Sequence, residues 1–546
     1  MIFESLKSMH NSLYMEQIQS LLLGVLPLIP GANIQQLVSM VASIYTISSG
    51  GVTQLNISRY GDLSYRSVTR FMGLRIEWHK VYIAQLAACC FGVGGNYLLV
   101  IDETVEGKSG KSTDKLGYFF CSKAKQMIKS VSFAVLSIVS VEKRTSYLVD
   151  YLQLEQDKVK AAANKADKLA KAAAVKADKL AKSATVKADK LAKSAAAKAD
   201  KGDKLAKLAT NNADKGTKLA ANELTKANKA DKITQKAVKT EKSVEPSEDL
   251  PKAVNKGGRP VGSTNKPKEK TDSVGFKALE FLLKRVLPLL KCINIAPAYL
   301  IGDGAYGNMT GCLIAREQGL HLISKLHHNS ALYHLPEAGS TKRKYGERVD
   351  FLNLDGDNKH PDIIKIMENA DKDGIMTCFQ IKQVRSEHID VAFNLVIVRY
   401  VCLKTNKSSL CLLFSTDIDL DGETLMDYYT LRFQIEFNFR DAKQYFGLSD
   451  FKSIKPVQVT NAVGLSFFMV NLSHVISDQA KKDLKTDFVS IQDIKAYFRA
   501  VFYAKRLKNT PDFSVPSFSD TKVIPFLALL GAVNLGQQTN KKKKAA

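Results

Sequence analysis

Short apolar runs rich in β-branched residues alternate along the chain with longer amphipathic stretches. Residues 1–90 have the apolar spacing of helices, interrupted by a Gly-Gly pair. The runs within 96–107, 130–142 and 145–154 have the length and composition of buried strands. This order predicts an N-terminal helical region followed by the first strands of a sheet.

The alternation resumes after a long polar interval. Helices are predicted at 274–293 and 308–319, and strands within 298–307 and 321–326. Residues 336–415 are predicted to be rich in strands, with candidates at 341–351, 376–384, 391–401 and 410–418. Further helices are predicted at about 421–446, 456–480 and 490–507. We therefore expect an α/β fold in which helices flank a mixed sheet.

The polar interval, residues 156–271, contains a repeat. The heptapeptide KADKLAK recurs with a period of 11 residues, beginning at Lys165, Lys176 and Lys187. Ala, Lys and Leu favour helix, and an 11-residue period is compatible with a right-handed coil. Each repeat has a single Leu, however, which leaves little apolar surface to bury. A solvated helical or fluctuating linker is therefore the preferred interpretation.

The interval ends in a Gly-Arg-Pro sequence flanked by lysines, with Arg259 at its centre. This segment resembles an AT-hook, in which the arginine enters a narrow A·T minor groove. The alternative is a Pro/Gly linker without a role in nucleic-acid binding.

Charge gives the first indication of a partner. The chain of 546 residues carries a formal net charge of +25, which favours nucleic acid or an acidic membrane surface as a partner. Residues 151–270 hold 29 Lys and Arg against 15 Asp and Glu, so they account for more than half of this excess.

Other features of the sequence argue against secreted and integral-membrane proteins. The eight cysteines show no CxxC pair and no zinc spacing, which indicates reduced thiols in the cytoplasm. The N-terminus lacks the pattern of a secretory signal. The best apolar run, 21–30, is too short to span a bilayer.

Residues 55–72 can form a short turn followed by a basic helix. Asp62 or Ser64 could cap that helix, which carries Arg66 and Arg70. A turn before a basic helix is compatible with helix-turn-helix DNA binding. The open alternative is a plain amphipathic helix in a bundle.

Two aspartates, Asp102 and Asp303, follow apolar strands. Each stands where a predicted buried strand ends and a glycine-containing turn follows. Ligand-binding groups of α/β folds concentrate at such strand ends, although an Asp after a strand is also a common turn former. We interpret both as candidate site residues.

The helix predicted at 421–446 carries polar side chains along one face. At 100° per residue, Tyr429, Arg432 and Lys443 lie within about 60° of one another and of Glu436. The adjoining apolar stripe, centred about 90° away, predicts the face that packs on the core; its members are Tyr428, Leu431, Ile435, Phe439 and Phe446. A solvated face with an i,i+4 ion pair is the simpler alternative, but it leaves the tyrosine and the two strand-end aspartates unexplained.

Three carboxylates flanked by cations suit metal-assisted cleavage of a phosphodiester. Mg²⁺ prefers oxygen ligands, and two such ions about 3.5–4 Å apart can activate a water or a 3′-hydroxyl. Arg432 and Lys443 would hold the phosphate oxygens. No histidine is then needed as a general base, and the nine histidines show no metal-ligand spacing.

The pattern Y-x₂-R-x₃-E-x₆-K, which begins at Tyr429, resembles the Tyr-Arg-Glu-Lys signature of a group of bacterial insertion-sequence DDE transposases. IDETVEGKSGK at 101–111 and LIGDGAYG at 300–307 resemble the two aspartate boxes of that group. The similarity covers about 95–155 and 272–475.

The resemblance implies an RNase-H-like catalytic domain with a β-rich insertion, which residues 336–405 would form. It also implies two Mg²⁺ ions, for which Mn²⁺ can substitute. The implied catalytic and metal-binding acids are Asp102, Asp303 and Glu436. The implied contacts to DNA phosphates are Tyr429, Arg432 and Lys443.

By the same resemblance, the activity would be cut-and-paste transposition in the bacterial cytoplasm, at the nucleoid and without a membrane partner. The enzyme would bind terminal inverted repeats as a homodimer, hydrolyse the ends of the element and join the 3′-hydroxyls to target DNA. Phe433 could stack on a displaced base in a hairpin intermediate. Further candidate DNA contacts are Arg66, Arg70, Arg259, Lys342, Arg343 and Lys344.

The spacing of the aspartates sets the domain organisation. Asp102 and Asp303 are 201 residues apart, but only 85 once 156–271 is removed, so that block is interpreted as an insertion into a complete catalytic domain. The predicted parts are an N-terminal helical DNA-binding domain at 1–90, a catalytic domain at 91–155, 272–335 and 406–480, the repeat insert at 156–271, a β-rich insertion at 336–405, and a C-terminal helical region with a basic tail at 481–546.

Two other functions remain open. The first is a metal-dependent nuclease of the same fold that lacks strand transfer. The second is a catalytically inactive DNA-binding protein, in which the basic insert binds DNA and the three acids are vestigial. The complete set of three acids argues against the second.

Overall fold

The computed structural model describes residues 15–48, 51–89, 95–156, 273–336, 344–356 and 359–508. All of them belong to one unit of the chain, which comprises 1–157 and 268–546. The predicted repeat insert beyond residue 156, with Arg259, lies outside the described residues, as do Lys342, Arg343 and the basic tail.

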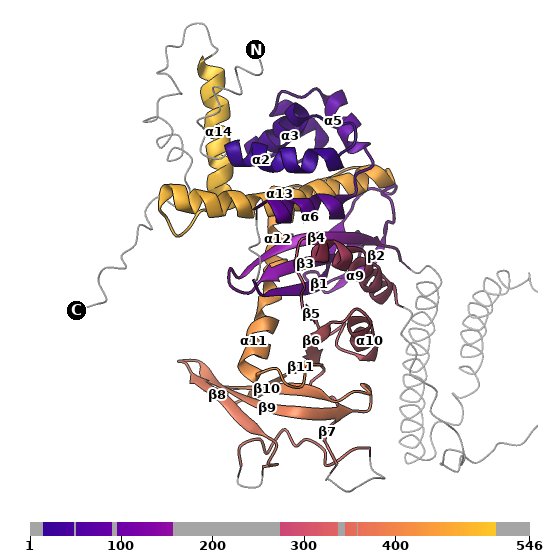
Figure 1. Cartoon of the computed structure of the whole chain (residues 1–546), viewed down its shortest axis with the longest axis vertical. Helices are drawn as coiled ribbons and strands as arrows, with labels where there is room; N and C mark the ends of the chain where they lie inside the picture. The colour runs from indigo at the N-terminus through magenta and orange to yellow at the C-terminus, as the bar shows by residue number, and fades with distance from the viewer. Residues whose placement is uncertain are drawn as a thin grey trace, which may run out of the picture. The chain divides into compact units, whose positions relative to one another are not determined.

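A mixed sheet of eleven strands is the framework of this unit (Figure 1). The strands are β1 (Tyr97–Gly107), β2 (Gly117–Cys121), β3 (Gln126–Ser140), β4 (Thr145–Leu154), β5 (Tyr299–Ile301), β6 (His321–Leu326), β7 (Leu332–His334), β8 (Ile364–Ala370), β9 (Gly374–Ser386), β10 (Phe393–Cys402) and β11 (Ser408–Ser415). Their order is β2-β3-β1-β5-β6-β11-β10-β9-β7, with β4 paired to β3 and β8 paired to β9.

The described helices pack around this sheet. They are α2 (Met15–Val25), α3 (Ile34–Thr46), α4 (Gln54–Arg59), α5 (Tyr65–Met72), α6 (Trp78–Cys89), α9 (Val274–Cys292), α10 (Met309–Glu317), α11 (Gly422–Leu431), α12 (Phe433–Tyr445), α13 (Pro456–Leu484) and α14 (Ile491–Lys508), with a 3₁₀ turn at Leu26–Leu28. The result confirms a mixed α/β fold.

Strand β1 joins the antiparallel and parallel parts of the sheet. It pairs antiparallel with β3 along its whole length and parallel with β5, which pairs parallel with β6. Parallel neighbours need a crossover connection, and α10 lies in the one between β5 and β6. Beyond β6 the sheet continues antiparallel through β11, β10 and β9.

Alternate residues of β1 serve two hydrophobic cores, because successive side chains of a strand point to opposite faces. Leu98 and Val100 belong to the core formed with α12, α13 and the N-terminal helices. Leu99 and Ile101 belong to the core formed with α9 and α10. A strand buried on both faces reads as a continuous apolar run, as this one does. The same alternation directs the next even-numbered residue, Asp102, toward α12.

The N-terminal helices α2, α5 and α6 pack against α13 (Figure 1). Trp78 of α6 donates a hydrogen bond from Nε1 to Asn461 Oδ1 at 3.0 Å. Its ring lies so close to Gly464 that a Cβ there would come within 2.3 Å of the indole. Among the described helices, α13 is long and apolar enough to cross a membrane, but 78% of that apolar window is buried inside the protein, as in a core helix.

Two sequence predictions about these elements are wrong. Residues 341–351 were predicted as a strand, but their described part, from Lys344, forms only an isolated bridge between Tyr333 and Arg348. The single helix predicted at 421–446 is two helices, α11 and α12, that meet at Arg432. There the backbone bonds run from Arg432 N to Tyr429 O and from Ile435 N to Arg432 O, and this tighter i→i+3 pattern interrupts the helix.

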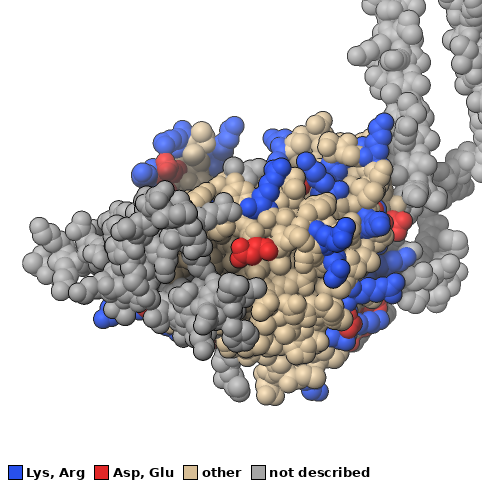
Figure 2. Space-filling model, turned by 90° about the horizontal axis from the view of Figure 1, so that it is seen from above, with Lys and Arg blue, Asp and Glu red and all other residues tan. Residues whose placement is uncertain are grey.

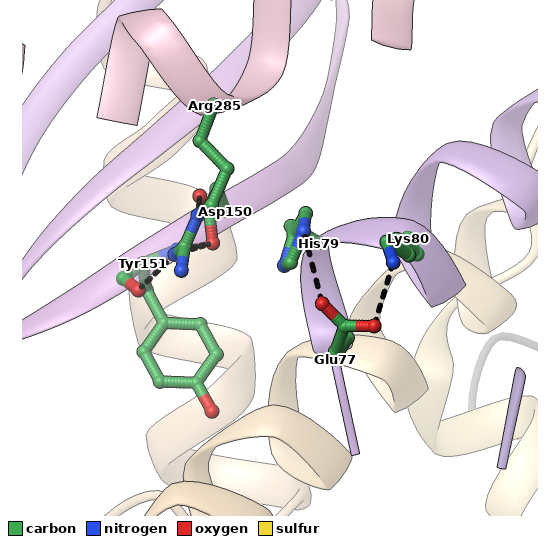
Figure 3. Close-up of polar contacts among 6 residues, drawn as sticks. All are labelled: Glu77, His79, Lys80, Asp150, Tyr151 and Arg285. Atoms are coloured by element: carbon green, nitrogen blue, oxygen red, sulfur yellow. Dashed lines mark hydrogen bonds and ion pairs between the residues drawn. The ribbon is translucent and has the colours of Figure 1, made fainter. Parts of the chain in front are cut away.

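A buried ion pair joins the two sides of the long interval. Arg285 of α9 donates from Nε and Nη2 to the two carboxylate oxygens of Asp150 on β4, both at 2.6 Å (Figure 3). Burial raises the pKa of Asp150 to about 6, although Arg285 opposes the shift. Nearby, burial and then the charge of Arg285 lower the pKa of His79 to about 4. Strand β4, before the interval, is therefore held directly by α9, which follows it.

Candidate active site

Asp102 lies on β1 directly after five buried apolar residues. Its side chain is 18% exposed and points toward α12. The backbone N–H of Glu103 donates to its Oδ1 at 2.8 Å, which leaves Oδ2 available to other groups. The strand therefore fixes this carboxylate at the edge of a buried core.

Asp303 stands two residues beyond the end of β5. Because β5 runs parallel to β1, the carboxyl ends of both strands meet at the same edge of the sheet. The turn is fixed by Ala305, whose N–H donates to Asp303 Oδ1 at 2.9 Å, and by Ser324, whose hydroxyl donates to the Asp303 carbonyl at 2.7 Å. The two aspartates thus approach each other although 201 residues separate them.

Arg432 joins two of the predicted acids. Its Nη1 donates to Asp102 Oδ2 and its Nη2 donates to Glu436 Oε1, both at 2.9 Å. The guanidinium carbon also lies 5.1 Å from the centre of the Phe433 ring and 5.9 Å from that of Tyr429. The remaining donor, Nε, is buried and has no hydrogen-bond partner. One face of the α11–α12 junction thus presents the predicted group of phenol, guanidinium and carboxylate.

The charges of the three predicted acids act on one another. Burial raises the pKa of Asp102 to about 6. The Arg432 guanidinium opposes this shift, whereas the negative charges of Asp303 and Glu436 add to it. Burial likewise raises the pKa of Tyr429, a shift that Arg432 opposes and Asp303 strengthens. Residues from β1, from the turn after β5 and from α12 therefore act on one another.

The signature lysine, Lys443, lies farther along α12, where this helix also contacts β1. Its ammonium forms an ion pair with Glu106 Oε1 at 2.7 Å and donates to the Val105 carbonyl at 3.4 Å. Glu106 is almost completely buried and also accepts a hydrogen bond from Ser449 at 2.6 Å. The sequence reasoning did not single out Glu106, which alternation along β1 places on the same face as Asp102.

Glu103 is a second acid that the sequence reasoning missed. Partial burial of its carboxyl group, and the nearby carboxylates of Asp102 and Asp303, raise its pKa. The hydroxyl of Tyr306 donates to Glu103 Oε1 at 3.4 Å and lowers that pKa. The sequence analysis selected Asp102 because it directly follows the apolar run of the strand. In the structure, alternation along β1 turns Asp102 toward α12 and Glu103 to the other face.

The three predicted acids have the chemistry of a divalent-cation site. All their donor atoms are carboxylate oxygens, the ligands that Mg²⁺ prefers. Burial is the main cause of the raised pKa of Asp102, and a cation would relieve the repulsion from Asp303 and Glu436 that adds to it. Within the described residues, their oxygens are not all within 4.8 Å of one another, and the Arg432 guanidinium bridges Asp102 and Glu436. A divalent ion would therefore replace an internal cation at this site.

The other predicted DNA contacts lie away from these acids. Ser64 accepts a hydrogen bond from the Ser67 N–H and caps α5, on which Arg66 and Arg70 are exposed one turn apart. Helix α5 packs on α4 and α13. Figure 2, seen from the end of the N-terminal helices, shows Lys and Arg over much more of the coloured surface than Asp and Glu.

Two further candidates have described positions. The side chain of Phe433 is 50% exposed at the start of α12, so its ring is accessible for stacking. Lys344 forms an ion pair with Asp390 at 3.3 Å. Of these two, Phe433 lies next to the acidic site, because its ring contacts the Arg432 guanidinium.

The fold brings together one histidine-containing group that spacing along the sequence does not reveal. The ligand atoms of His334, His360 and Asp362 all lie within 4.8 Å of one another. Its members come from β7 and from the turn before β8, which the tertiary fold brings together. Patterns of metal-ligand spacing along the sequence detect ligands that lie close together in the chain, and these ligands do not.

Comparison with known proteins found a family match over part of the chain. Residues 254–472 match a family model described as "Transposase DDE domain". This is about two fifths of the chain, and it includes Asp303 and Glu436. No curated protein matches the sequence. Among solved structures, a cryo-EM structure of the piggyBac transposase synaptic complex with hairpin DNA is similar with a TM-score of 0.33 and 10% identity, over 94% of this chain and 79% of that one. The chain thus contains a segment similar to a transposase DDE domain.

Proposed function

We propose that this protein is a DNA transposase of the DDE type, which binds the terminal inverted repeats of an insertion sequence and performs cleavage and strand transfer with Mg²⁺. The observation that carries the proposal is that Arg432 bridges Asp102 and Glu436, while the charge of Asp303 acts on Asp102. The match of residues 254–472 to a transposase DDE domain supports it. The resemblance of the Tyr429–Lys443 pattern to the Tyr-Arg-Glu-Lys signature would place it in the bacterial insertion-sequence group.

The catalytic domain would be RNase-H-like, interrupted by the repeat insert and by the β-rich insertion. The mixed sheet with helices on both faces supports this assignment. The boundaries given above, with a DNA-binding domain at 1–90, the insert at 156–271 and a β-rich insertion at 336–405, are part of the proposal.

Asp102, Asp303 and Glu436 would hold two Mg²⁺ ions, for which Mn²⁺ could substitute. Bound ions would supply an activated water or 3′-hydroxyl and stabilise the departing oxygen of the phosphodiester. The chain itself would position the DNA. Arg432 has a free Nε donor beside the acids and would turn its guanidinium toward a phosphate.

Tyr429 and Lys443 would also bind the phosphates near the scissile bond. The hydroxyl of a tyrosine and the ammonium of a lysine both donate to phosphate oxygens. The exposed ring of Phe433, next to Arg432, would stack on a base displaced from the duplex, as a hairpin intermediate would require.

Further contacts to DNA would come from the N-terminal helices. α4 and α5 are joined by a five-residue turn, and Arg66 and Arg70 of α5 are exposed. Arg259 in the AT-hook-like segment and the run Lys342–Lys344 are additional candidates. The active assembly would be a homodimer on paired ends, located in the bacterial cytoplasm at the nucleoid.

The decisive experiment incubates the full chain with Mg²⁺, a supercoiled plasmid and DNA that carries the element's own ends. Joined products support transposition. Cleavage without joining would instead identify a nuclease of the same fold. Binding that is unaffected by Glu436→Gln, with neither cleavage nor joining by the unaltered protein, would identify a catalytically inactive DNA-binding protein.

A further inference from the structure

We propose that His334, His360 and Asp362 form a second metal site, which binds a Zn²⁺-type ion and lies apart from the acidic site. These three are the described residues whose ligand atoms gather within 4.8 Å. The site belongs to the part of the sheet beyond β6, and none of its ligands contributes to the contacts of Asp102, Asp303 or Glu436 described above.

Two separate segments supply the ligands. His334 ends β7, where its backbone N–H donates to the Glu347 carbonyl at 2.8 Å and its carbonyl accepts from Gly346 at 3.0 Å. His360 and Asp362 lie in the turn that leads into β8, closed by a bond from Ile363 N to His360 O at 3.0 Å. The backbone therefore holds His334 firmly, whereas the other two ligands sit on a turn.

The spacing of the ligand atoms fits a single ion. Asp362 Oδ2 lies 3.6 Å from His334 Nδ1 and 3.5 Å from His360 Nδ1. A tetrahedral ion with bonds of about 2.0–2.2 Å has ligand atoms separated by about 3.3–3.6 Å. These distances are longer than those of ordinary hydrogen bonds and match the edges of that tetrahedron. His360 Nδ1 also accepts a hydrogen bond from the Asp362 N–H at 3.3 Å, which a bound ion would replace.

An unsatisfied buried atom points to the same ligand. His334 is 1% exposed, and its Nδ1 has no hydrogen-bond partner. A buried polar atom without a partner costs about 1–3 kcal/mol, so such atoms usually mark a missing water or ion. Here His334 Nδ1 lies 3.6 Å from Asp362 Oδ2. A cation bound between them would have both atoms as ligands.

The donor set selects the class of ion. Two imidazole nitrogens and one carboxylate suit Zn²⁺ and its neighbours Co²⁺ and Ni²⁺, whereas Mg²⁺ and Ca²⁺ prefer oxygen ligands alone. His360 and Asp362 are partly open to solvent, which leaves room for a water as the fourth ligand. The two rings are stacked with centres 3.5 Å apart, so His360, the more exposed ring, must tilt to turn its lone pair toward the ion.

The site would fasten the turn before β8 onto β7. Strand β7 has three residues, which pair with the end of β9 and form one isolated bridge, from Tyr333 to Arg348. A metal link would therefore stabilise the edge of the sheet at that point. The proposal concerns this local stability and does not depend on the function proposed above.

The test measures Zn²⁺ bound by the full chain after gel filtration, with excess Mg²⁺ present and in a Glu436→Gln background that weakens the acidic site. We expect one Zn²⁺ per chain and, with Co²⁺, the intense visible absorption of a four-coordinate ion. His360→Gln and Asp362→Asn should each weaken binding by at least about 10-fold, and His388→Gln, an exposed histidine nearby on the sequence, should not.

Both variants change exposed or half-exposed side chains, so the fold should survive, and circular dichroism checks this. Protection of the 344–363 segment from proteolysis should increase with Zn²⁺ in the parent and not in the variants. Absence of bound Zn²⁺ in the parent protein, or equal binding by all variants, would overturn the proposal.

Discussion

Arg432 donates to Asp102 with one nitrogen and to Glu436 with another, so one guanidinium holds two of the three acids together. This side chain therefore occupies a place that a cation could take between the two carboxylates. A divalent ion bound between these carboxylates would require the Arg432 side chain to turn away from them.

Replacing Arg432 by Gln should separate metal binding from catalysis. Mn²⁺ affinity of the free protein should rise several-fold, because a competing internal cation is lost. Cleavage of end DNA should fall by about 10²–10³-fold, because a donor to the phosphate is lost. Calorimetry with Mn²⁺ and single-turnover cleavage measure the two effects. A parallel loss of both would show that Arg432 only supports the fold.

Each of Asp102→Asn, Asp303→Asn and Glu436→Gln should abolish detectable cleavage while leaving affinity for end DNA within a few-fold. The reason is that each removes a carboxylate charge from the metal site without changing side-chain volume. Glu423→Gln is the matched control, since Glu423 is exposed in the first turn of α11. Full cleavage by any of the three variants would remove that acid from the site.

The Lys443–Glu106 pair should contribute to stability as well as to DNA binding. Lys443→Met leaves the buried Glu106 carboxylate without its cation, which should cost about 3 kcal/mol of unfolding free energy. The double variant Lys443→Met, Glu106→Gln should recover much of that loss in urea unfolding but not the affinity for DNA. If the double variant also recovers DNA binding, Lys443 does not contact phosphate.

Stability should rise between pH 7 and pH 9 because of Lys495. This lysine on α14 is 7% exposed and donates to the Ile44 carbonyl at 2.7 Å. Burial lowers its pKa from 10.5 to about 7. The unfolded chain therefore binds more protons over this range, and unfolding free energy should increase by about 2 kcal/mol from pH 7 to pH 9.

Lys495→Met should remove that increase, whereas Lys482→Met, an exposed lysine at the end of α13, should retain it. Urea unfolding at the two pH values measures both. An unchanged slope in Lys495→Met would mean that the lysine is solvated in the folded state.

Replacing 156–271 by a short Gly/Ser linker should leave the protein folded. The ion pair of Asp150 with Arg285 already connects β4 with α9 across this interval. Cleavage should persist, whereas DNA affinity should weaken and its dependence on salt should flatten as basic residues are lost. A soluble, folded deletion without cleavage would assign the insert a part in catalysis.

Much of the site could be predicted because its signals are local. The apolar run of β1 ends at Asp102, and helical periodicity placed Tyr429, Arg432 and Glu436 on one face. The buried stripe from Tyr428 to Phe446 is likewise as predicted.

What could not be predicted depends on contacts between distant segments. Lys443 faces Glu106 because two elements pack together, and nothing in either segment specifies the partner. The interruption at Arg432 leaves the helical periodicity intact, so the pattern read as one helix. Residues 341–351 alternate like a strand, but a side-chain pattern alone does not supply a partner strand, and their described part forms just one bridge.

The pairing of β1 with β5 has a consequence for synthesis on the ribosome. Strands β1, β3 and β4 leave the ribosome together, but β5 and α9 follow only after more than 100 further residues. At about 5–20 residues per second, translation of that interval takes roughly 6–23 s. During this time one edge of β1 and the apolar face that α9 later covers are open to other chains. The protein should therefore depend on holding chaperones during synthesis more than a version without the interval.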